Sequence, residues 1–583
     1  MDSPLTQQAR PEIFEPKVVG LYKRLFTDVH DDEIPQGFWA ELFLLRPDLP
    51  RLQQVLENAD SGLLIQSQHH SHQLLIQSIA ALKLGRPPAD EHALDVVAGL
   101  DNVDAVFSEL VASLDNIIRK DGGDLSLRLK AVRTAIAVVS GGYQTALVSY
   151  FVNRDFFPAI MRLVQQLDDP LQATEPILLV GLLAIHGKVA ESVGQLSSML
   201  RAQYIAVQDD TPLAWSVAGT LSYVGLGALA GAKPTQPVFT EEQQRDMFTK
   251  LPGPEASTLV TVYDFALANK LFCRRFVAWE ATDKEEPPPF SAFISFTSYL
   301  YQHAYRSARA SSYAYLTLLI LFILVEDAAI AKLLCETTTP VRLCRQRPPF
   351  LPLPRNDRSY AAAIIDLLAD GINHNLRKRL DTAFYAQTLT VLSRLLTYLA
   401  RSWTKLQYHW CELWRSLLSF VRFLNQYAED MHTLPGTTQL VQSLVDLLAL
   451  ALAGGEALLP DETAYDDLFY KLVESGDALV KLRDTYQLGK PDDKKAAINT
   501  LIGVSKHYQE VIESHRAKKE HLSPREIEKI IRQGYDTLNV ETQREDQVQG
   551  RGFREADIKS EVKRFLKVVV ADAVVLVSAP RAT

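Results

Sequence analysis

The chain has 583 residues, of which 47% are hydrophobic and 22% are charged. This apolar content is enough to bury a large core and excludes an intrinsically disordered chain. Acidic side chains outnumber basic ones and leave a net charge of −9, which argues against a protein that binds nucleic acid over its whole surface.

The cysteines and the N-terminus point to a reducing, cytosolic environment. The four cysteines, Cys273, Cys335, Cys344 and Cys411, are far apart and form no CxxC pair, so they do not read as a disulfide framework. The N-terminal sequence MDSPLTQQARPEIFEP lacks the basic start and apolar core of a signal peptide. We therefore expect any membrane contact to be made from the cytosolic side.

The N-terminal half reads as a succession of short amphipathic helices bounded by glycine, aspartate or proline. No stretch shows the sustained alternation of polar and apolar residues that a half-buried strand requires. An acidic linker from Asp283 to Pro289 ends this half. The helices expected here cover residues 18–26, 37–45, 49–58, 61–84, 103–119, 126–139, 143–151, 157–167, 176–200, 211–230, 241–250 and 257–279.

The longest apolar run of the chain, Tyr313 to Val325, lies at the start of the second half. As a helix it would be about 20 Å long, whereas a membrane span needs about 20 apolar residues and 30 Å. A short helix that is apolar on every side is one that neighbouring helices bury. We therefore predict a core helix at the centre of a helical stack.

The remaining helices lead to the fold class. Thr463 with Asp466 resembles a capping box, and Ser523 followed by Pro524 is typical of a helix start. Helix pairs recur at about 35 to 45 residues without a repeated consensus, which predicts an all-α, irregular armadillo/HEAT-like α-solenoid. The domains expected are a helical-repeat half over 1–283, a second half over 284–540, and a charged linker with a C-terminal helix over 541–583. The expected helices are 290–301, 360–380, 383–400, 408–429, 438–452, 465–485, 493–518 and 558–577.

Four stretches of the second half carry a resemblance to a known family. They are VRLCRQRPP at 341–349, DGINHNLRKRLD from Asp370, YHWCELWRSLLSFVRFL from Tyr408 and AYDDLFYKLV from Ala464. Together they resemble the armadillo-like helical domain-containing protein 3 family, as a fungal-type homologue. The resemblance implies a non-catalytic scaffold or adaptor, cytoplasmic and peripheral on Golgi membranes, without a cofactor.

The same resemblance implies partners and a process. The protein would recruit or regulate a phosphatidylinositol 4-kinase, which makes phosphatidylinositol 4-phosphate, and the Arf-activation machinery through an Arf exchange factor. It would thereby support Golgi organisation and secretion, with peripheral contact to anionic membrane and no nucleic acid. The alternatives are another helical-repeat binding protein, such as a transport receptor, or an unrecognised enzyme.

The motifs that would favour those alternatives are incomplete. None of the six tryptophans is followed four residues later by asparagine, as the ladder of a nuclear-import receptor requires. The GxGxxA pattern at 225–230 closes an expected helix instead of following a strand, and GLLAIHGK at 181–188 is one residue too long for a phosphate loop. His69, His70 and His72 form the only histidine cluster, without a nearby carboxylate. We predict no catalytic, metal or cofactor residues.

An apolar stripe with a basic margin is expected on the helix after Tyr408. Trp410, Leu413, Trp414, Leu417, Val421 and Leu424 recur at spacings of three and four. This periodicity predicts core packing, with exposed recognition aromatics as the alternative. Arg415 and Arg422 fall on an adjoining face and would form a cationic rim.

Basic clusters are the candidate docking sites for an acidic partner or anionic lipid, although such cations are often only solvated near a helix end. The proline-rich strap at 342–355 could instead lie as an extended peptide in a groove of the solenoid. The C-terminal helix could be an interfacial membrane helix or a cap that folds back on the last repeat. The candidate docking residues are Arg342, Arg345, Arg347, Arg377, Lys378, Arg379, Arg415, Arg422, Lys563, Arg564 and Lys567.

Overall fold

The computed structural model of the chain is almost entirely helical where it is described. The described residues are 19–21, 103–120, 122–143, 147–167, 170–189, 252–279, 288–344, 358–375, 381–489, 496–516 and 553–578. Within these ranges the strands are two two-residue segments. The all-α prediction is therefore confirmed. The helices predicted at 37–84, 211–230 and 241–250, the histidine cluster and the Ser523 helix start lie outside the described residues.

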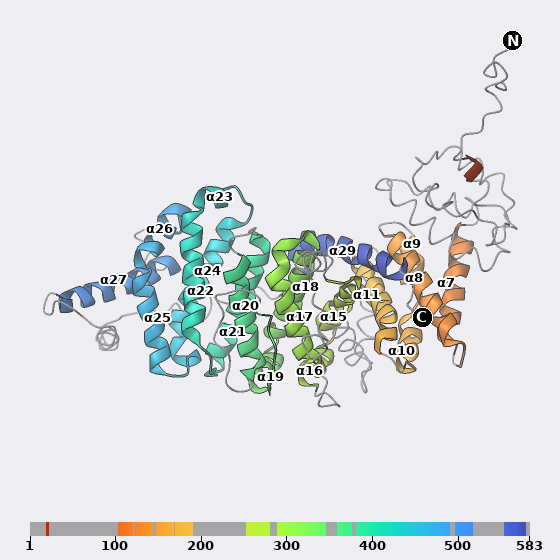
Figure 1. Cartoon of the computed structure of the whole chain (residues 1–583), viewed down its shortest axis with the longest axis horizontal. Helices are drawn as coiled ribbons and strands as arrows, with labels where there is room; N and C mark the ends of the chain where they lie inside the picture. The colour runs from red at the N-terminus through yellow and green to blue at the C-terminus, as the bar shows by residue number, and fades with distance from the viewer. Residues whose placement is uncertain are drawn as a thin grey trace, which may run out of the picture. The chain divides into compact units, whose positions relative to one another are not determined.

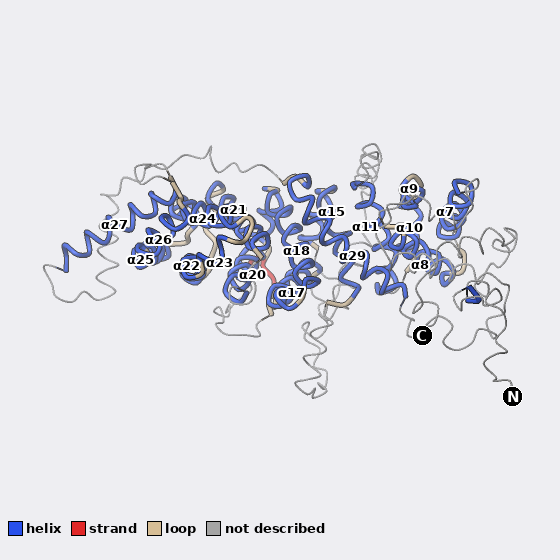
Figure 2. Tube along the Cα trace, turned by 90° about the horizontal axis from the view of Figure 1, so that it is seen from above, coloured by secondary structure: helices blue, strands red, loops and turns tan. Residues whose placement is uncertain are grey.

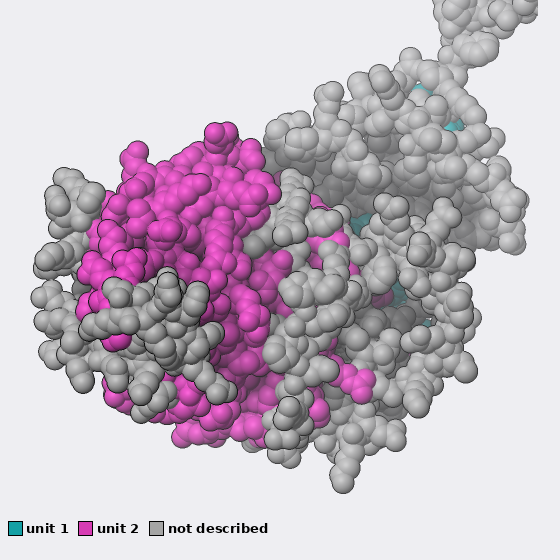
Figure 3. All heavy atoms as spheres, turned by 60° about the vertical axis from the view of Figure 1, so that its left-hand side comes forward, with its two compact units in different colours: residues 1–167, 175–198, 570–583 teal, residues 168–174, 199–569 magenta. Residues whose placement is uncertain are grey.

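The chain divides into two compact units, which Figure 3 shows in different colours. Unit 1 comprises residues 1–167, 175–198 and 570–583, and unit 2 comprises residues 168–174 and 199–569. The division falls within the C-terminal helix α29 (Lys559–Ser578). Residues 559–569 of this helix belong to unit 2.

The described helices of unit 1 follow the predicted order. Asp124 caps α8, because its carboxylate accepts a hydrogen bond from the backbone N–H of Ser126 at 3.0 Å. Asp115 is buried and binds both Arg119 and Arg154, at 2.9 and 2.8 Å, so its charge is compensated. The helices are α7 (Val103–Arg119), α8 (Leu125–Gly141), α9 (Leu147–Val152), α10 (Phe157–Gln165) and α11 (Thr174–Val189).

Unit 2 is built from two layers of helices that advance side by side (Figures 1 and 2). In one layer α15 packs on α18, α18 on α21, α21 on α24 and α24 on α27; in the other α17 packs on α20, α20 on α22 and α22 on α25. This pairing confirms the irregular α-solenoid. The helices are α15 (Leu259–Ala268), α16 (Lys270–Ala278), α17 (Pro289–His303), α18 (Ala308–Glu326), α19 (Ala328–Glu336), α20 (Tyr360–Asn375), α21 (Thr382–Arg401), α22 (Trp410–Gln426), α23 (Ala428–His432), α24 (Thr437–Leu458), α25 (Glu462–Glu474), α26 (Gly476–Tyr486) and α27 (Ala497–Arg516), with 3-10 turns η4 (Pro170–Ala173), η7 (Pro254–Thr258), η8 (Ala304–Arg306) and η10 (Glu555–Ile558).

The central apolar run forms α18, as predicted. Ser307 caps its start by accepting from the N–H of Ala310 at 3.0 Å, and the Asp327 carboxylate after its end caps α19. By length and composition alone, α18 and α24 could each cross a membrane. However, 78% of the apolar window of α18 and 56% of that of α24 are buried inside the protein. The prediction of a buried core helix is therefore confirmed for α18.

Three predicted helices are divided in the structure. The one expected at 257–279 breaks at Asn269, whose side chain accepts from the N–H groups of Leu271 and Phe272 and so starts α16. The one at 465–485 breaks at Ser475 into α25 and α26, and the one at 408–429 breaks at Tyr427 into α22 and α23. Both helices on either side of each break bury an apolar face, so the apolar periodicity of the sequence continues across the break. The periodicity alone therefore does not reveal where one helix ends and the next begins.

The helix start predicted at Thr463 is also wrong. The cap of α25 is Asp461, whose carboxylate accepts from the N–H of Ala464 at 2.9 Å. Aspartate caps at least as well as threonine and adds a favourable charge at the positive end of the helix dipole. The helix therefore begins at Glu462, before the predicted box.

A short clamp closes the base of the proline-rich strap. Strands β1 (Thr338–Thr339) and β2 (Arg358–Ser359) pair antiparallel. The backbone N–H of Cys344 donates to Ser298 Oγ at 2.7 Å, which ties the first part of the strap to α17. Residues 345–357 between these anchors lie outside the described part of the chain.

Candidate functional site

The structure places the predicted basic residues in very different surroundings. Arg345, Arg347, Arg377, Lys378 and Arg379 lie outside the described ranges. Arg342 is exposed after β1.

The expected cationic rim of α22 has carboxylate partners. Arg415 donates to Glu412 Oε2 at 2.7 Å. Arg422 lies 3.6 Å from Glu474 Oε1 and donates to Ser475 Oγ at 3.3 Å. Both arginine side chains are at least half exposed, so these are surface pairs of small energy. In each pair, the carboxylate nevertheless offsets the positive charge that the arginine would present to an anionic ligand.

The described C-terminal segment packs on α15 and α18, the first two helices of one layer of unit 2. Val562, Phe565, Leu566 and Val569 face inward and are buried. The Phe565 ring meets the ring of Tyr263 on α15 edge to face, with centroids 5.8 Å apart. Aromatic pairs at this geometry add to the energy of area burial. The apolar side of the first half of α29 is therefore covered by the protein itself.

Aromatic and polar contacts fix the start of this segment. Phe553 lies against Tyr263 and against Phe322 of α18, with centroids 6.5 and 5.6 Å away. Its backbone N–H donates to Glu326 Oε2 at 2.8 Å. The Tyr263 hydroxyl donates to Glu555 Oε1 at 3.0 Å. Burial, reinforced by the Glu555 charge, raises the pKa of Tyr263 far above its usual value, so the phenol stays a donor.

These contacts argue against both interpretations of the C-terminal helix, the cap on the last repeat and the interfacial membrane helix. Its partners are α15 and α18, whereas the last described repeat is formed by α25, α26 and α27. The expected cap on the last repeat is therefore wrong. The buried face of residues 559–569 is also not available for insertion into a membrane. An apolar helix face requires a partner, and here α15 and α18 provide it.

The opposite face of α29 carries a row of lysines. Lys559, Lys563 and Lys567 are spaced by four residues and all three are exposed; we call them the lysine stripe. No described residue forms an ion pair with them. Their neighbour Arg564 is bound to Asp381 Oδ2 at 3.2 Å. Like charges at this spacing disfavour a helix by a few tenths of a kcal/mol each, so the packing of the other face must hold them together.

The lysine stripe can bind an anionic surface. Each lysine near an anionic membrane contributes about 1 kcal/mol of binding free energy. An acidic protein segment carries negative charge as such a membrane does, and could bind the same lysines. The candidate docking residues included Lys563 and Lys567 but not Lys559, and they included Arg564, which is bound to Asp381. The spacing of four residues from Lys563 back to Lys559 could have identified the third lysine of the stripe.

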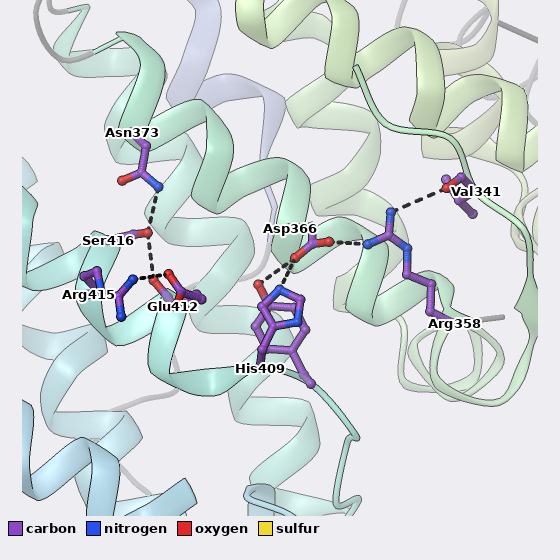
Figure 4. A network of polar contacts seen from close by, with 9 residues as sticks. Val341, Arg358, Asp366, Asn373, His409, Glu412, Arg415 and Ser416 are labelled. Atoms are coloured by element: carbon purple, nitrogen blue, oxygen red, sulfur yellow. Dashed lines mark hydrogen bonds and ion pairs between the residues drawn. The ribbon is translucent and has the colours of Figure 1, made fainter. Parts of the chain in front are cut away.

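A second polar cluster is centred on Asp366 of α20 (Figure 4). Its carboxylate is fully buried and binds the guanidinium of Arg358 through Oδ2. Its other oxygen accepts from the Tyr408 hydroxyl at 2.9 Å and lies 3.0 Å from His409 Nε2. Burial and the Asp366 charge hold the pKa of Tyr408 well above its usual value. We call these four residues the Asp366 network.

The Asp366 network joins three segments rather than presenting a reactive group. Arg358 follows the strap, Asp366 lies on α20, and Tyr408 and His409 precede α22. Both carboxylate oxygens are occupied by donors from the protein. In the described part of the chain, no group of three or more histidine, cysteine, aspartate or glutamate side chains could hold a metal ion. The Asp366 network therefore has a structural role, because it holds the end of the strap, α20 and the start of α22 together.

Comparisons with known proteins agree with this fold. The family model described as Armadillo-like helical domain-containing protein 3, C-terminal, matches residues 358–575. A Schizosaccharomyces pombe protein named UPF0588 membrane protein is 25% identical over 577 residues, which cover 91% of this chain and 92% of the relative. Proteins named armadillo-like helical domain-containing protein 3 from Danio rerio and Homo sapiens are each 22% identical, over 90% of this chain and 89% of their own.

The chain is similar to armadillo-like helical domain-containing protein 3 over about nine-tenths of both chains. No solved structure matches it. The match to the C-terminal domain of armadillo-like helical domain-containing protein 3 begins at Arg358 of the Asp366 network and extends past the lysine stripe. Both clusters therefore lie in the part of the chain that this family model covers.

Proposed function

We propose that the chain is a non-catalytic helical scaffold on the cytosolic face of Golgi membranes. It recruits or regulates a phosphatidylinositol 4-kinase and the Arf-activation machinery, and so supports Golgi organisation and secretion. The observation that carries this proposal is the similarity to armadillo-like helical domain-containing protein 3 over about nine-tenths of both chains. The Schizosaccharomyces pombe relative is named a membrane protein, which is compatible with a role at a membrane.

The architecture of unit 2 supports a role through surfaces. A solenoid of stacked helix pairs presents extended faces that contact large partners, and each repeat adds area without a central pocket. The lysine stripe gives one such face a local positive charge on a chain whose net charge is −9. A scaffold of this kind attracts an acidic segment of its partner at the stripe and leaves the remainder of the surface for shape-dependent contacts.

The proposal is tested by charge reversal on the lysine stripe. In the full chain, Lys563→Glu with Lys567→Glu is expected to reduce Golgi association or the recovery of the kinase and the Arf exchange factor, because it removes two attractive charges and adds two repulsive ones. The thermal midpoint should stay nearly unchanged, since exposed charges contribute little to folding. The measurements are fluorescence localisation and affinity purification from cells.

A matched control has the same change in net charge. Lys481→Glu with Lys506→Glu reverses two exposed lysines of α26 and α27 and should leave both readouts as in the wild type. Equal behaviour of the two double variants would remove the stripe from the proposal. A wild-type chain that neither reaches the Golgi nor recovers either partner would contradict the proposed function itself.

A further inference from the structure

Trp403 of unit 2 is exposed to solvent, unlike the buried Trp410 and Trp414. Trp403 follows the end of α21 with φ 51°, a left-handed conformation in which glycine is usual at the end of a helix. The N–H of Thr404 donates to Leu399 O at 3.0 Å, and that of Trp403 donates to Ala400 O at 3.4 Å. These two bonds close the helix. The side chain is 65% exposed, the largest value among the described large hydrophobic residues.

Basic side chains flank this tryptophan. Arg401 precedes it by two residues and Lys405 follows it by two, and both are exposed. Neither is paired with a carboxylate in the part of the chain that the structure describes. The turn therefore presents an indole between two uncompensated positive charges.

A second helix of unit 2, α16, repeats this combination. On α16, Leu271 is 50% exposed, and Arg274 and Arg275 are exposed three and four residues later, on the same face. No described carboxylate forms an ion pair with either arginine. The first two turns of α16 thus add a second protruding apolar side chain and two more cations.

The short helix α19 connects these two groups along one edge of unit 2. It packs against α16 and against α21, and Figure 1 shows α16 and α19 together on the lower edge. Lys270 of α16 lies 3.1 Å from Asp327 at the start of α19, and Lys332 lies 3.7 Å from Glu336. These pairs are neutral, so the positive charge of the edge comes from the other four cations. We call Leu271, Arg274, Arg275, Arg401, Trp403 and Lys405 the Trp403 edge.

The chemistry of the edge favours a lipid surface over a protein. The core of a protein interface gathers its aromatic anchors into one packed patch. Here two apolar side chains stand apart, each with cations beside it. Tryptophan is enriched at the boundary between lipid and water, and arginine and lysine attract anionic headgroups.

We propose that the Trp403 edge docks on an anionic membrane, with Trp403 and Leu271 entering the headgroup region. This proposal rests on the proposed function at a membrane and assigns it a contact surface. It also separates that surface from the lysine stripe. Arg564, beside the stripe, binds Asp381 at the start of α21, whereas Trp403 follows its end. The 20 residues of α21 span about 30 Å.

This separation assigns different partners to the two surfaces. At physiological salt, charges are screened over about 8 Å, so a flat membrane at the Trp403 edge exerts little force on the lysine stripe. The stripe then remains available to an acidic protein partner while the edge holds the membrane.

The test measures sedimentation of the purified full chain with vesicles of phosphatidylcholine, with and without phosphatidylserine. Wild type should bind the anionic vesicles and bind more weakly at physiological than at low salt. Trp403→Gly should weaken this binding by about tenfold while preserving the fold, because glycine accepts the left-handed conformation. Arg401→Glu with Lys405→Glu should remove the preference for phosphatidylserine. Lys481→Glu with Lys506→Glu, which reverses two exposed lysines of α26 and α27, is the matched control and should bind as wild type does.

Each contrary result has a separate meaning. Wild-type binding without any preference for anionic vesicles, or Trp403→Gly binding at full strength, overturns the membrane contact and leaves the scaffold proposal to its own test of partner recovery. Full vesicle binding by Trp403→Gly with loss of the kinase would make the edge a protein-binding surface. Quenching of tryptophan fluorescence by brominated lipid, present in wild type and reduced in Trp403→Gly, would show that the indole enters the bilayer.

Discussion

Trp414→Ala is expected to lower the free energy of unfolding by about 3 to 5 kcal/mol, the usual range for removing a large aromatic side chain from a core. Trp414 is 0% exposed on α22, and its ring stacks on that of Trp410 with centroids 5.6 Å apart. The deletion leaves a cavity beside Trp410 in the core of unit 2, which the neighbouring helices would have to move to fill. A fall in the thermal midpoint, followed by circular dichroism at 222 nm, is the measurement.

Phenylalanine variants sharpen this prediction. The indole N–H of Trp410 donates to Leu406 O at 3.1 Å, which ties the start of α22 to the preceding loop. The indole N–H of Trp414 is buried without a hydrogen-bond partner in the described part of the chain. Trp410→Phe should therefore cost more than Trp414→Phe, because only the first change breaks a hydrogen bond and leaves a carbonyl unsatisfied.

Trp403 supplies the control within the same sequence stretch. Trp403→Gly should leave the unfolding free energy unchanged or raise it by about 0.5 to 1 kcal/mol, since it relieves a left-handed non-glycine residue and exposes no core. If Trp414→Ala kept full thermal stability and lost only a binding partner, Trp414 would have to be a recognition residue, contrary to its burial.

The core was predictable because its signal is local. Trp410, Trp414 and Leu417 recur at the period of a helix, and the structure buries all three. The apolar run from Tyr313 to Val325 was likewise recognisable as a core helix. In both cases a side chain and the neighbours that set its pattern lie within a few residues along the chain.

Features that depend on distant residues were not predictable. One of the contacts that hold the C-terminal segment joins Tyr263 to Glu555, which are 292 residues apart. The sequence around either residue does not indicate that the other is its partner. The display of Trp403 depends on a left-handed turn that its residue type disfavours, so propensity would have predicted glycine there. The break at Asn269 needed the side-chain cap itself, which periodicity does not report.

Asp366→Ala is the second change with a large expected effect. It removes the carboxylate that compensates Arg358, whose side chain is only 10% exposed, and leaves the Tyr408 hydroxyl and the His409 ring without their acceptor. Deleting one partner of a buried ion pair costs about 3 to 5 kcal/mol. The thermal midpoint should therefore fall by about as much as in Trp414→Ala, although the deleted side chain is much smaller.

Paired variants separate the charge from the packing. Arg358→Met together with Asp366→Leu should be much less destabilising than Asp366→Ala alone, because a buried ion pair replaced by apolar side chains of similar volume is often neutral. Asp366→Asn should fall between the two, since its amide oxygen still accepts from Tyr408 while Arg358 loses its counter-charge. A double variant as unstable as Asp366→Ala would show that the network stabilises by geometry, through the joining of the strap, α20 and α22, and not by compensation of charge.

Because the network closes the base of the strap at Arg358, that outcome would also predict faster proteolysis within residues 345–357 in every variant that breaks the network.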